Sequence, residues 1–384
     1  MSIVALSKCD TYHQSEVDDA LCNCLSLLGG LDQIIKPGQR VLLKVNTVAG
    51  IHPDRAATTH PALVAAIIKE VKKAGGIPCV GDSPGVPAGK VETVMETTGL
   101  KEVAESLGAE IVNFEKSGSL AFDSPSGQLK EKLQIAKAVL AADVIINLPK
   151  LKTHNVLLYT GAIKNMFGSV PGFHKSRYHL YAPKPHQLAS VMVDIFQITK
   201  PRLSIMDAVV GMDGPGPQSG NPYHLGILAA SLDAVALDAV CAYLIGKDPL
   251  SIETTRIAHE RGIGIGDLNR IEVLGCDLNE AKVDDFDFKQ ATTALRLASQ
   301  IPSLLQAMVQ PFASRIRIEP IINRPACTKC LVCHKICPTQ AISENLKIDY
   351  NKCIMCFCCH ELCSYKAINL KRNWLAKLLS IGHD

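Results

Sequence analysis

The chain has 384 residues, which is too long for one ordinary domain and predicts two or three. It is 47% hydrophobic and 20% charged, so it can bury a large core, and its net charge of +3 is too small to indicate nucleic acid as a partner. No stretch approaches the roughly 18 apolar residues of a membrane span, and the N-terminus lacks the apolar core of a signal peptide. We therefore expect a soluble cytoplasmic protein with no transmembrane segment, of undetermined oligomeric state.

The first 290 residues alternate predicted strands and helices. A strand is expected at 40–46, and a helix follows at 61–74, where Pro61 suits the first helical turn. Further strands are expected at 77–82, 109–114, 143–148, 202–207 and 225–230, with helices at 90–107, 186–199 and 232–246. This repeated alternation predicts an α/β fold, with a mostly parallel sheet and helices on both of its faces.

The rest of the chain is divided into three predicted parts after the α/β domain at 1–290. A helical linker is expected at 291–320, although two prolines interrupt its pattern. A small α+β domain follows at 321–370. A short amphipathic tail is expected at 371–384, and docking of this tail on its own protein is favoured over contact with a membrane or a partner.

Nine of the fifteen cysteines lie in the predicted small domain. Eight of them form two runs with the spacing C-x2-C-x2-C-x3-C, namely Cys327, Cys330, Cys333 and Cys337, followed by Cys353, Cys356, Cys359 and Cys363. In an intracellular chain, such cysteines are expected to bind metal rather than to form disulfides. The ninth, Cys358, is expected to point away from its neighbours. Ala-Ile pairs at matching places after both runs indicate an internal two-fold repeat.

The doubled run resembles that of bacterial two-cluster ferredoxins over about residues 322–370. The resemblance implies two 4Fe–4S clusters, each completed by the fourth cysteine of the opposite run. One cluster would take Cys327, Cys330, Cys333 and Cys363, and the other would take Cys353, Cys356, Cys359 and Cys337. Electron transfer is the expected role, because two neighbouring clusters form a relay. A purely structural role is an alternative, and so is zinc, although zinc ribbons use paired C-x2-C motifs.

Polar side chains follow several predicted strands of the α/β domain. Because ligands bind at the carboxyl ends of strands in such sheets, we expect these side chains to share a pocket. The candidates are Lys44, Asn46, Asp82, Lys150, Lys152, His154, Lys164, Asn165 and, after a strand that ends at Asp207, Asp213. The lysines and the imidazole suit an anionic substrate such as a carboxylate or a phosphate. The alternative is that Lys44 only extends its ammonium to the surface, and that Asp82 and Asp213 only stabilise turns.

Five motifs between about residues 40 and 240 resemble the domain-of-unknown-function 362 family. They are Lys44-Val45-Asn46, Gly81-Asp82-Ser83-Pro84, Pro149-Lys150-Leu151-Lys152-Thr153-His154, Gly161-Ala162-Ile163-Lys164-Asn165-Met166-Phe167-Gly168 and Gly211-Met212-Asp213-Gly214-Pro215-Gly216-Pro217. Members of this family often carry a ferredoxin-like segment. The resemblance implies an architecture and the place of a site, but it does not imply a substrate.

A weaker resemblance is to the nickel-pincer lactate racemase family, in which a histidine lies ten residues before a lysine. His154 and Lys164 show that interval. The resemblance implies that His154 moves a proton and that Lys164 anchors a cofactor. A nickel-binding histidine would then be His174, His179 or His186.

The preferred prediction is an iron–sulfur oxidoreductase whose clusters exchange single electrons with a redox partner protein or with a small anionic substrate on the α/β domain. The predicted catalytic residues are His154, Lys164, Asp82 and Lys152, and the predicted substrate-binding residues are Lys44, Asn46, Lys150, Asn165 and Asp213. One alternative is a ferredoxin-type carrier or maturation factor without catalysis. The other is a non-redox racemase- or lyase-like enzyme. No G-x-G-x-x-G opening a helix and no Walker A motif are present, so a nucleotide cofactor is not predicted.

Overall fold

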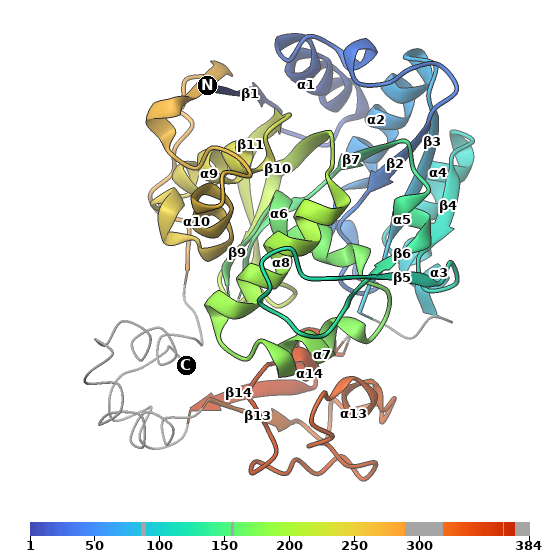
Figure 1. The fold of residues 1–384 in the computed structure, drawn as a ribbon, viewed down its shortest axis with the longest axis vertical. Helices are drawn as coiled ribbons and strands as arrows, with labels where there is room; N and C mark the ends of the chain where they lie inside the picture. The colour runs from blue at the N-terminus through green and yellow to red at the C-terminus, as the bar shows by residue number, and fades with distance from the viewer. Residues whose placement is uncertain (86–89, 155–156, 289–317, 364, 373–384) are drawn as a thin grey trace.

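The computed structural model describes residues 1–85, 90–154, 157–288, 318–363 and 365–372. A large α/β domain reaches residue 288, and a smaller C-terminal segment, residues 318–372, lies against one end of it (Figure 1). The predicted linker at 291–320 lies outside the described residues except for its last three, which belong to a strand. The predicted tail at 371–384 also lies outside them, apart from two residues that end another strand.

The α/β domain is built on one large mixed sheet. Its strands are β1 Ser2–Lys8, β2 Arg40–Lys44, β3 Ile77–Asp82, β4 Glu110–Asn113, β7 Val144–Asn147, β8 Lys150–His154, β9 Leu158–Thr160, β10 Leu203–Asp213, β11 Asn221–Ser231 and β12 Ile271–Gly275. They follow the order β12-β1-β11-β10-β7-β2-β3-β4, with β8 beside β10 and β9 beside β8. Most pairs are parallel, whereas β11 is antiparallel to both of its neighbours. The predicted mostly parallel α/β sheet is confirmed.

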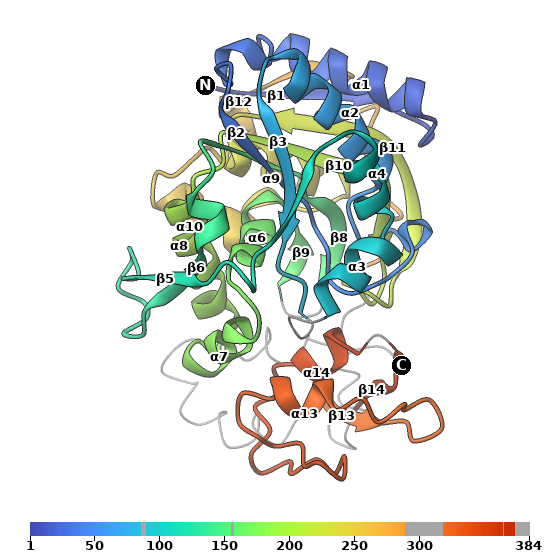
Figure 2. The same ribbon diagram turned by 90° about the vertical axis from the view of Figure 1, so that its right-hand side faces the viewer.

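Helices cover both faces of this sheet (Figure 2). On one face lie α1 Gln14–Leu27, α2 Pro61–Lys73 and α4 Leu100–Ser106, and on the other α6 Ala162–Asn165, α8 Pro185–Thr199, α9 Ala234–Leu244 and α10 Glu253–Glu260. Alternate residues of a strand point to opposite faces, so Leu42 of β2 joins one core while Val41 and Leu43 join the other. The inner residues of β2 and β7 are therefore apolar on both faces, as expected for a sheet covered on both sides.

The helix predicted at 90–107 is two helices, α3 Val91–Thr97 and α4. Gly99 separates them with a left-handed φ of 71°, a conformation that ends a helix and that glycine adopts at little cost. No prediction covers β1, α1 or β12. The domain also carries α5 Lys137–Leu140, α7 His174–Tyr181 and a separate antiparallel pair, β5 Ser119–Phe122 and β6 Leu133–Ala136.

Two further predictions are wrong around β10, in the middle of the sheet. The strand predicted at 202–207 continues to Asp213, because β11 pairs with β10 along its whole length, with an irregularity between Ala208 and Val210. Asp207 therefore lies inside β10 rather than at its end. The stretch after 143–148, where no strand is predicted, forms β8, which pairs with β10 and β9.

The C-terminal segment contains β13 Ile318–Ile322, α13 Val332–Ile336, α14 Cys358–Glu361 and β14 Ile368–Arg372, and its two strands pair antiparallel. The two cysteine runs share backbone features at matching places. Lys329 and Met355 have left-handed φ values of 56° and 54°, and a ring nitrogen of His334, like that of His360, lies 2.6 Å from a backbone carbonyl. The predicted repeat is thus present in the local geometry of both runs.

Across the described parts of the chain, no helix has both the length and the hydropathy needed to cross a bilayer.

A buried ion pair fixes β8 to β10. Lys150 Nζ lies 3.0 Å from Asp207 Oδ2, and the two side chains are 1% and 0% exposed. The Tyr12 hydroxyl donates to Asp207 Oδ1 and accepts from Lys150 Nζ, each at 2.7 Å, while the His60 backbone N–H donates to Asp207 Oδ2 at 2.8 Å. Burial lowers the pKa of Lys150, although Asp207 opposes this effect. The pair therefore depends on both partners being present.

Substitution of Asp207 by asparagine is expected to lower the free energy of unfolding by about 3 kcal/mol, because it leaves the Lys150 ammonium buried without its counter-charge. The matched control is Asp18→Asn, which breaks a pair with Lys69 whose side chains are 35% and 42% exposed. That change should cost about 0.5 kcal/mol or less. Urea unfolding followed by circular dichroism measures both, and equal losses in the two variants would contradict the prediction.

Candidate functional site

A cavity of about 120 Å³ lies where the α/β domain meets the C-terminal segment. Its walls come from the carboxyl ends of β2 and β3, from β8, α6 and α7, and from α14. We call it the inner cavity. The ionisable side chains that line it include Lys152, Lys164, Lys175, His154, His179 and Glu361.

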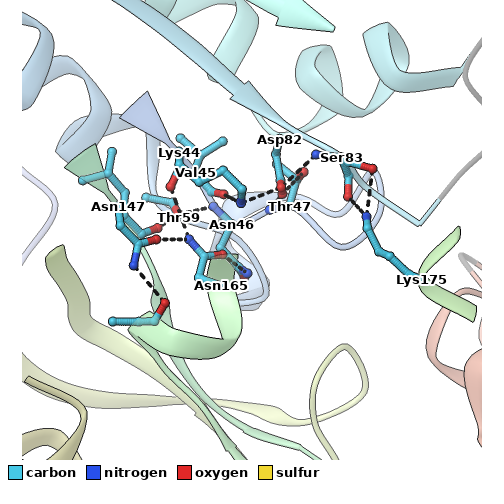
Figure 3. A network of polar contacts seen from close by, with 12 residues as sticks. Lys44, Val45, Asn46, Thr47, Thr59, Asp82, Ser83, Asn147, Asn165 and Lys175 are labelled. Carbon is cyan, nitrogen blue, oxygen red and sulfur yellow. Dashed lines mark hydrogen bonds and ion pairs between the residues drawn. The ribbon is translucent and has the colours of Figure 1, made fainter. Parts of the chain in front are cut away.

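Three asparagines hold one wall of the inner cavity. Asn46 Nδ2 donates to Asn165 Oδ1 at 2.8 Å, and Asn165 Nδ2 donates to Asn147 Oδ1 at 2.8 Å (Figure 3). Lys152 Nζ donates to Asn46 Oδ1 and to the Ala57 carbonyl, both at 2.6 Å. Because each amide nitrogen meets an oxygen, the chain fixes the orientation of every amide. It also fixes the position of the Lys152 amine.

A second buried pair, Lys44 and Asp82, supports the neighbouring wall. Their charged atoms are 2.6 Å apart, and the side chains are 0% and 2% exposed. Asp82 also accepts the backbone N–H and hydroxyl of Thr47 and the N–H of Ser83 (Figure 3). A Cβ at Gly168 would overlap both Asp82 Oδ1 and Lys44 Nζ, so only glycine fits there. The oxygens of Asp82 are thus occupied by protein donors.

The three lysines of the inner cavity have weakened basicity. Burial lowers the pKa of Lys152 well below its usual range, and the nearby Lys164 lowers it further. Burial also lowers the pKa of Lys164, against the attraction of Glu361, and lowers that of Lys175 to about 8. Lys175 Nζ donates to Ser83 Oγ at 2.8 Å and to the Ser83 carbonyl (Figure 3). Buried amines whose pKa values are lowered are typical of functional sites.

His154 and Glu361 meet across the junction between the two parts of the molecule. The Leu157 N–H donates to His154 Nδ1 at 3.1 Å, so a neutral ring carries its proton on Nε2, which lies 3.4 Å from Glu361 Oε1. Burial would raise the pKa of Glu361, but His154, Lys164 and His179 outweigh it and lower that pKa to about 2. Burial lowers the pKa of His154, and it lowers that of His179 to about 4. A carboxylate thus faces neutral imidazoles.

The structure brings many of the predicted site residues together. Those that line the inner cavity are Asn46, Asp82, Lys152, His154, Lys164 and Asn165. Lys44 lies behind Asp82, and Lys150 is paired with Asp207. Asp213 lies at the end of β10, where its carboxylate accepts the Asp287 N–H at 3.3 Å. Of the three histidines considered for nickel, His179 lines the inner cavity.

Sequence reasoning did not find the C-terminal contribution to the inner cavity. Glu361 lies far along the chain from His154, and no local motif links the two. Packing holds it in place, because a Cβ at Gly85 would overlap the Leu362 side chain, and Gln218 Nε2 donates to the Glu361 carbonyl. In the sequence, Gly85 in the loop after Asp82 is the one residue that indicates a close approach of another segment to this loop. Lys175 carried no comparable signal.

Two smaller cavities in the C-terminal segment are lined by cysteines. One is lined by Cys327, Cys330, Cys333 and Cys363, and the other by Cys337, Cys353, Cys356 and Cys359. Cys358 also lines the second of these, and it lines the inner cavity. Among the residues that the structure describes, no three His, Cys, Asp or Glu side chains are grouped so as to hold a metal ion.

A family model, one curated protein and one solved structure are similar to this chain. Residues 41–243 match the model of a domain of unknown function, DUF362. A Synechocystis protein described as thylakoid-associated is 38% identical over 261 residues, which cover 68% of this chain and 79% of that protein. A solved Thermotoga maritima structure from a structural genomics consortium is similar over 59% of this chain and 56% of its own, with 12% identity and a TM-score of 0.32.

The affinity of the inner cavity for sulfate should fall as the pH rises through about 8. An amine binds anions only below its pKa, and burial lowers that of Lys175 to about 8. In Lys175→Arg the guanidinium stays charged, so the decline should move to higher pH. Sulfate keeps its charge throughout this range, and calorimetric titration from about pH 6.5 to about pH 9.5 measures both proteins. Identical pH profiles of sulfate affinity in the two proteins, or a flat profile for the unmodified chain, would contradict the role of Lys175 as an anion-binding amine with a lowered pKa.

Proposed function

The chain belongs to the DUF362 family, and from its site we propose that it is an iron–sulfur oxidoreductase acting on a small anionic molecule in the inner cavity. The observation that carries the proposal is the crossing of the two cysteine runs. Each cysteine-lined cavity takes three residues from one run and the fourth from the other. This is the arrangement that the ferredoxin-like spacing implies.

The residues around these cavities fit two 4Fe–4S clusters. Each cavity offers four thiol groups among apolar side chains, and the Ala341 and Ala367 N–H groups donate to the Sγ atoms of Cys337 and Cys363 at 3.2 Å. Hydrogen bonds to ligand sulfur are one way in which proteins set cluster potentials. Clusters bound here would supply or accept single electrons.

Cys358 lies in the walls of one cysteine cavity and of the inner cavity. It is buried, and the cysteine cavity is the one that Cys337 lines. A substrate in the inner cavity would therefore be separated from the predicted cluster ligands by little more than this side chain and its backbone. Short separation favours electron exchange between the two sites without a mobile carrier.

The α/β domain would bind and orient the substrate. The amines of Lys152, Lys164 and Lys175 favour a carboxylate or phosphate group. The Nε2–H of His154 is placed to donate a hydrogen bond to a substrate atom that gains electron density, while Glu361 orients the ring.

A second candidate function is a non-redox, racemase-like reaction. It is favoured by one observation, which is that His154, Lys164 and His179 all line the inner cavity. In that case, a nickel cofactor would be attached at Lys164. Native mass measurement separates the candidates, because attachment predicts extra mass that disappears in Lys164→Ala, whereas the first proposal predicts none beyond the clusters.

The redox partner and the cellular location are part of the proposal. The Synechocystis relative is described as thylakoid-associated, which suggests that an electron donor or acceptor of this chain is associated with a membrane.

Anaerobically reconstituted protein should contain about eight irons and about eight acid-labile sulfides per chain. Cys337 and Cys353 line the same cavity, so the double variant Cys337→Ser, Cys353→Ser should keep about four irons. The double variant Cys337→Ser, Cys327→Ser spans both cavities and should keep almost none. Iron and sulfide analysis, with the visible absorption spectrum, measures both variants.

Cys358→Ser is the matched control for these variants, because Cys358 belongs to neither ligand set. It should keep the full iron content. Colourless protein after reconstitution, or bound zinc in its place, would refute the iron–sulfur assignment. If the Cys337→Ser, Cys327→Ser variant kept more iron than the Cys337→Ser, Cys353→Ser variant, the exchange of the fourth cysteine between the two runs would be refuted.

A further inference from the structure

A second groove, of about 710 Å³, adjoins the inner cavity, and we call it the outer groove. It lies between α7 of the α/β domain and α13 of the C-terminal segment, and both views show α7 beside that segment (Figures 1 and 2). Ser176 and Ile336 belong to the walls of both spaces. The outer groove is therefore next to the inner cavity, with these two residues in the wall of each.

The lining of the outer groove is basic. It includes Arg177 and Lys335, both exposed, together with His174 and His334. Among its described lining residues there is no carboxylate. Arg177 donates to the Tyr181 hydroxyl at 3.1 Å, which directs its guanidinium along α7. A concave surface with cations on both walls favours an anionic group between them.

The sizes of the two spaces bear on the ligand. The inner cavity, at about 120 Å³, holds a small anionic head group but falls short of the roughly 300–1,000 Å³ of typical ligand sites. The outer groove brings the combined space into that range. A molecule with its head in the inner cavity would extend past Ser176 and Ile336 into the basic groove.

We propose that the outer groove is a second anion subsite and that the substrate carries a carboxylate or phosphate group at each end. The proposal rests on the proposed function, in which the inner cavity takes the first anionic group. Lys164 and Lys175 would hold the inner group, and Arg177 and Lys335 the outer one. Because the outer pair is exposed to water and salt, its contribution should be moderate.

The test compares two series of synthetic ligands of increasing chain length. Alkyl monophosphates and α,ω-alkane bisphosphates of two to eight carbons are titrated into the anaerobically reconstituted full chain by calorimetry. The monophosphates should bind with affinities that change little with chain length. The bisphosphates should bind about tenfold more tightly once the chain spans the two subsites, and no more tightly when it is too short.

Variants assign that gain to the outer groove. Arg177→Ala and Lys335→Ala should each remove most of the bisphosphate gain while leaving ethyl phosphate binding unchanged. Lys352→Ala, an exposed lysine of the same segment that does not line the groove, controls for general charge. Lys164→Gln should weaken both ligand series, because both place one phosphate in the inner cavity.

The outcomes distinguish a failure of the second anion subsite from a failure of the proposed function. Equal affinities for mono- and bisphosphates at every length, or a gain that survives both outer variants, would overturn the second subsite and leave the inner cavity untouched. Failure of ethyl phosphate to bind at all would overturn the anion cavity of the proposed function, and the second subsite with it.

Discussion

The contact between His154 and Glu361 is the interaction on which the site depends. The α/β domain gathers three lysines and two histidines around one cavity, and burial of so many basic groups without counter-charge is costly. The lowered pKa values of these groups are the physical expression of that cost. Glu361, from the C-terminal segment, lies 3.4 Å from the His154 ring and supplies a carboxylate that partly balances them. The two parts of the chain are therefore electrostatically complementary at the place where they meet.

The remaining polar groups of the α/β domain make the site rigid. Lys44 with Asp82, and Lys150 with Asp207, are fully buried pairs whose oxygens also accept hydrogen bonds from nearby groups. Such pairs add little net stability, but they tolerate few alternative arrangements of the chain. They hold β2, β3, β8 and β10 in register, so that the less firmly paired amines of the inner cavity project from a fixed frame. This division separates structural cations from those available to a ligand.

The sequence predicts more of the fold than of the candidate site. The apolar runs of β2, β3 and β7 and the proline at the start of α2 predicted the central strands and a helix, because strand and helix periodicity are local properties. Lys150 could not be separated from Lys152 by pattern alone. Both lie on the strand β8, but Lys150 is paired with Asp207 whereas Lys152 lines the inner cavity. The roles of Glu361 and Cys358 depend on how the C-terminal segment packs, which no local pattern encodes.

The position of Glu361 links the two halves of the proposed function. It lies in the sequence between Cys359 and Cys363, which line different cysteine cavities. The helix α14, which ends at Glu361, begins at Cys358. The carboxylate that contacts His154 is therefore placed by a short stretch whose two ends belong to separate predicted ligand sets. If both sets are filled, that stretch is held at both ends and Glu361 is fixed against the imidazole. Under the proposed function, assembly of the cysteine sites and completion of the substrate cavity are then one structural event, because the same few residues of α14 serve both.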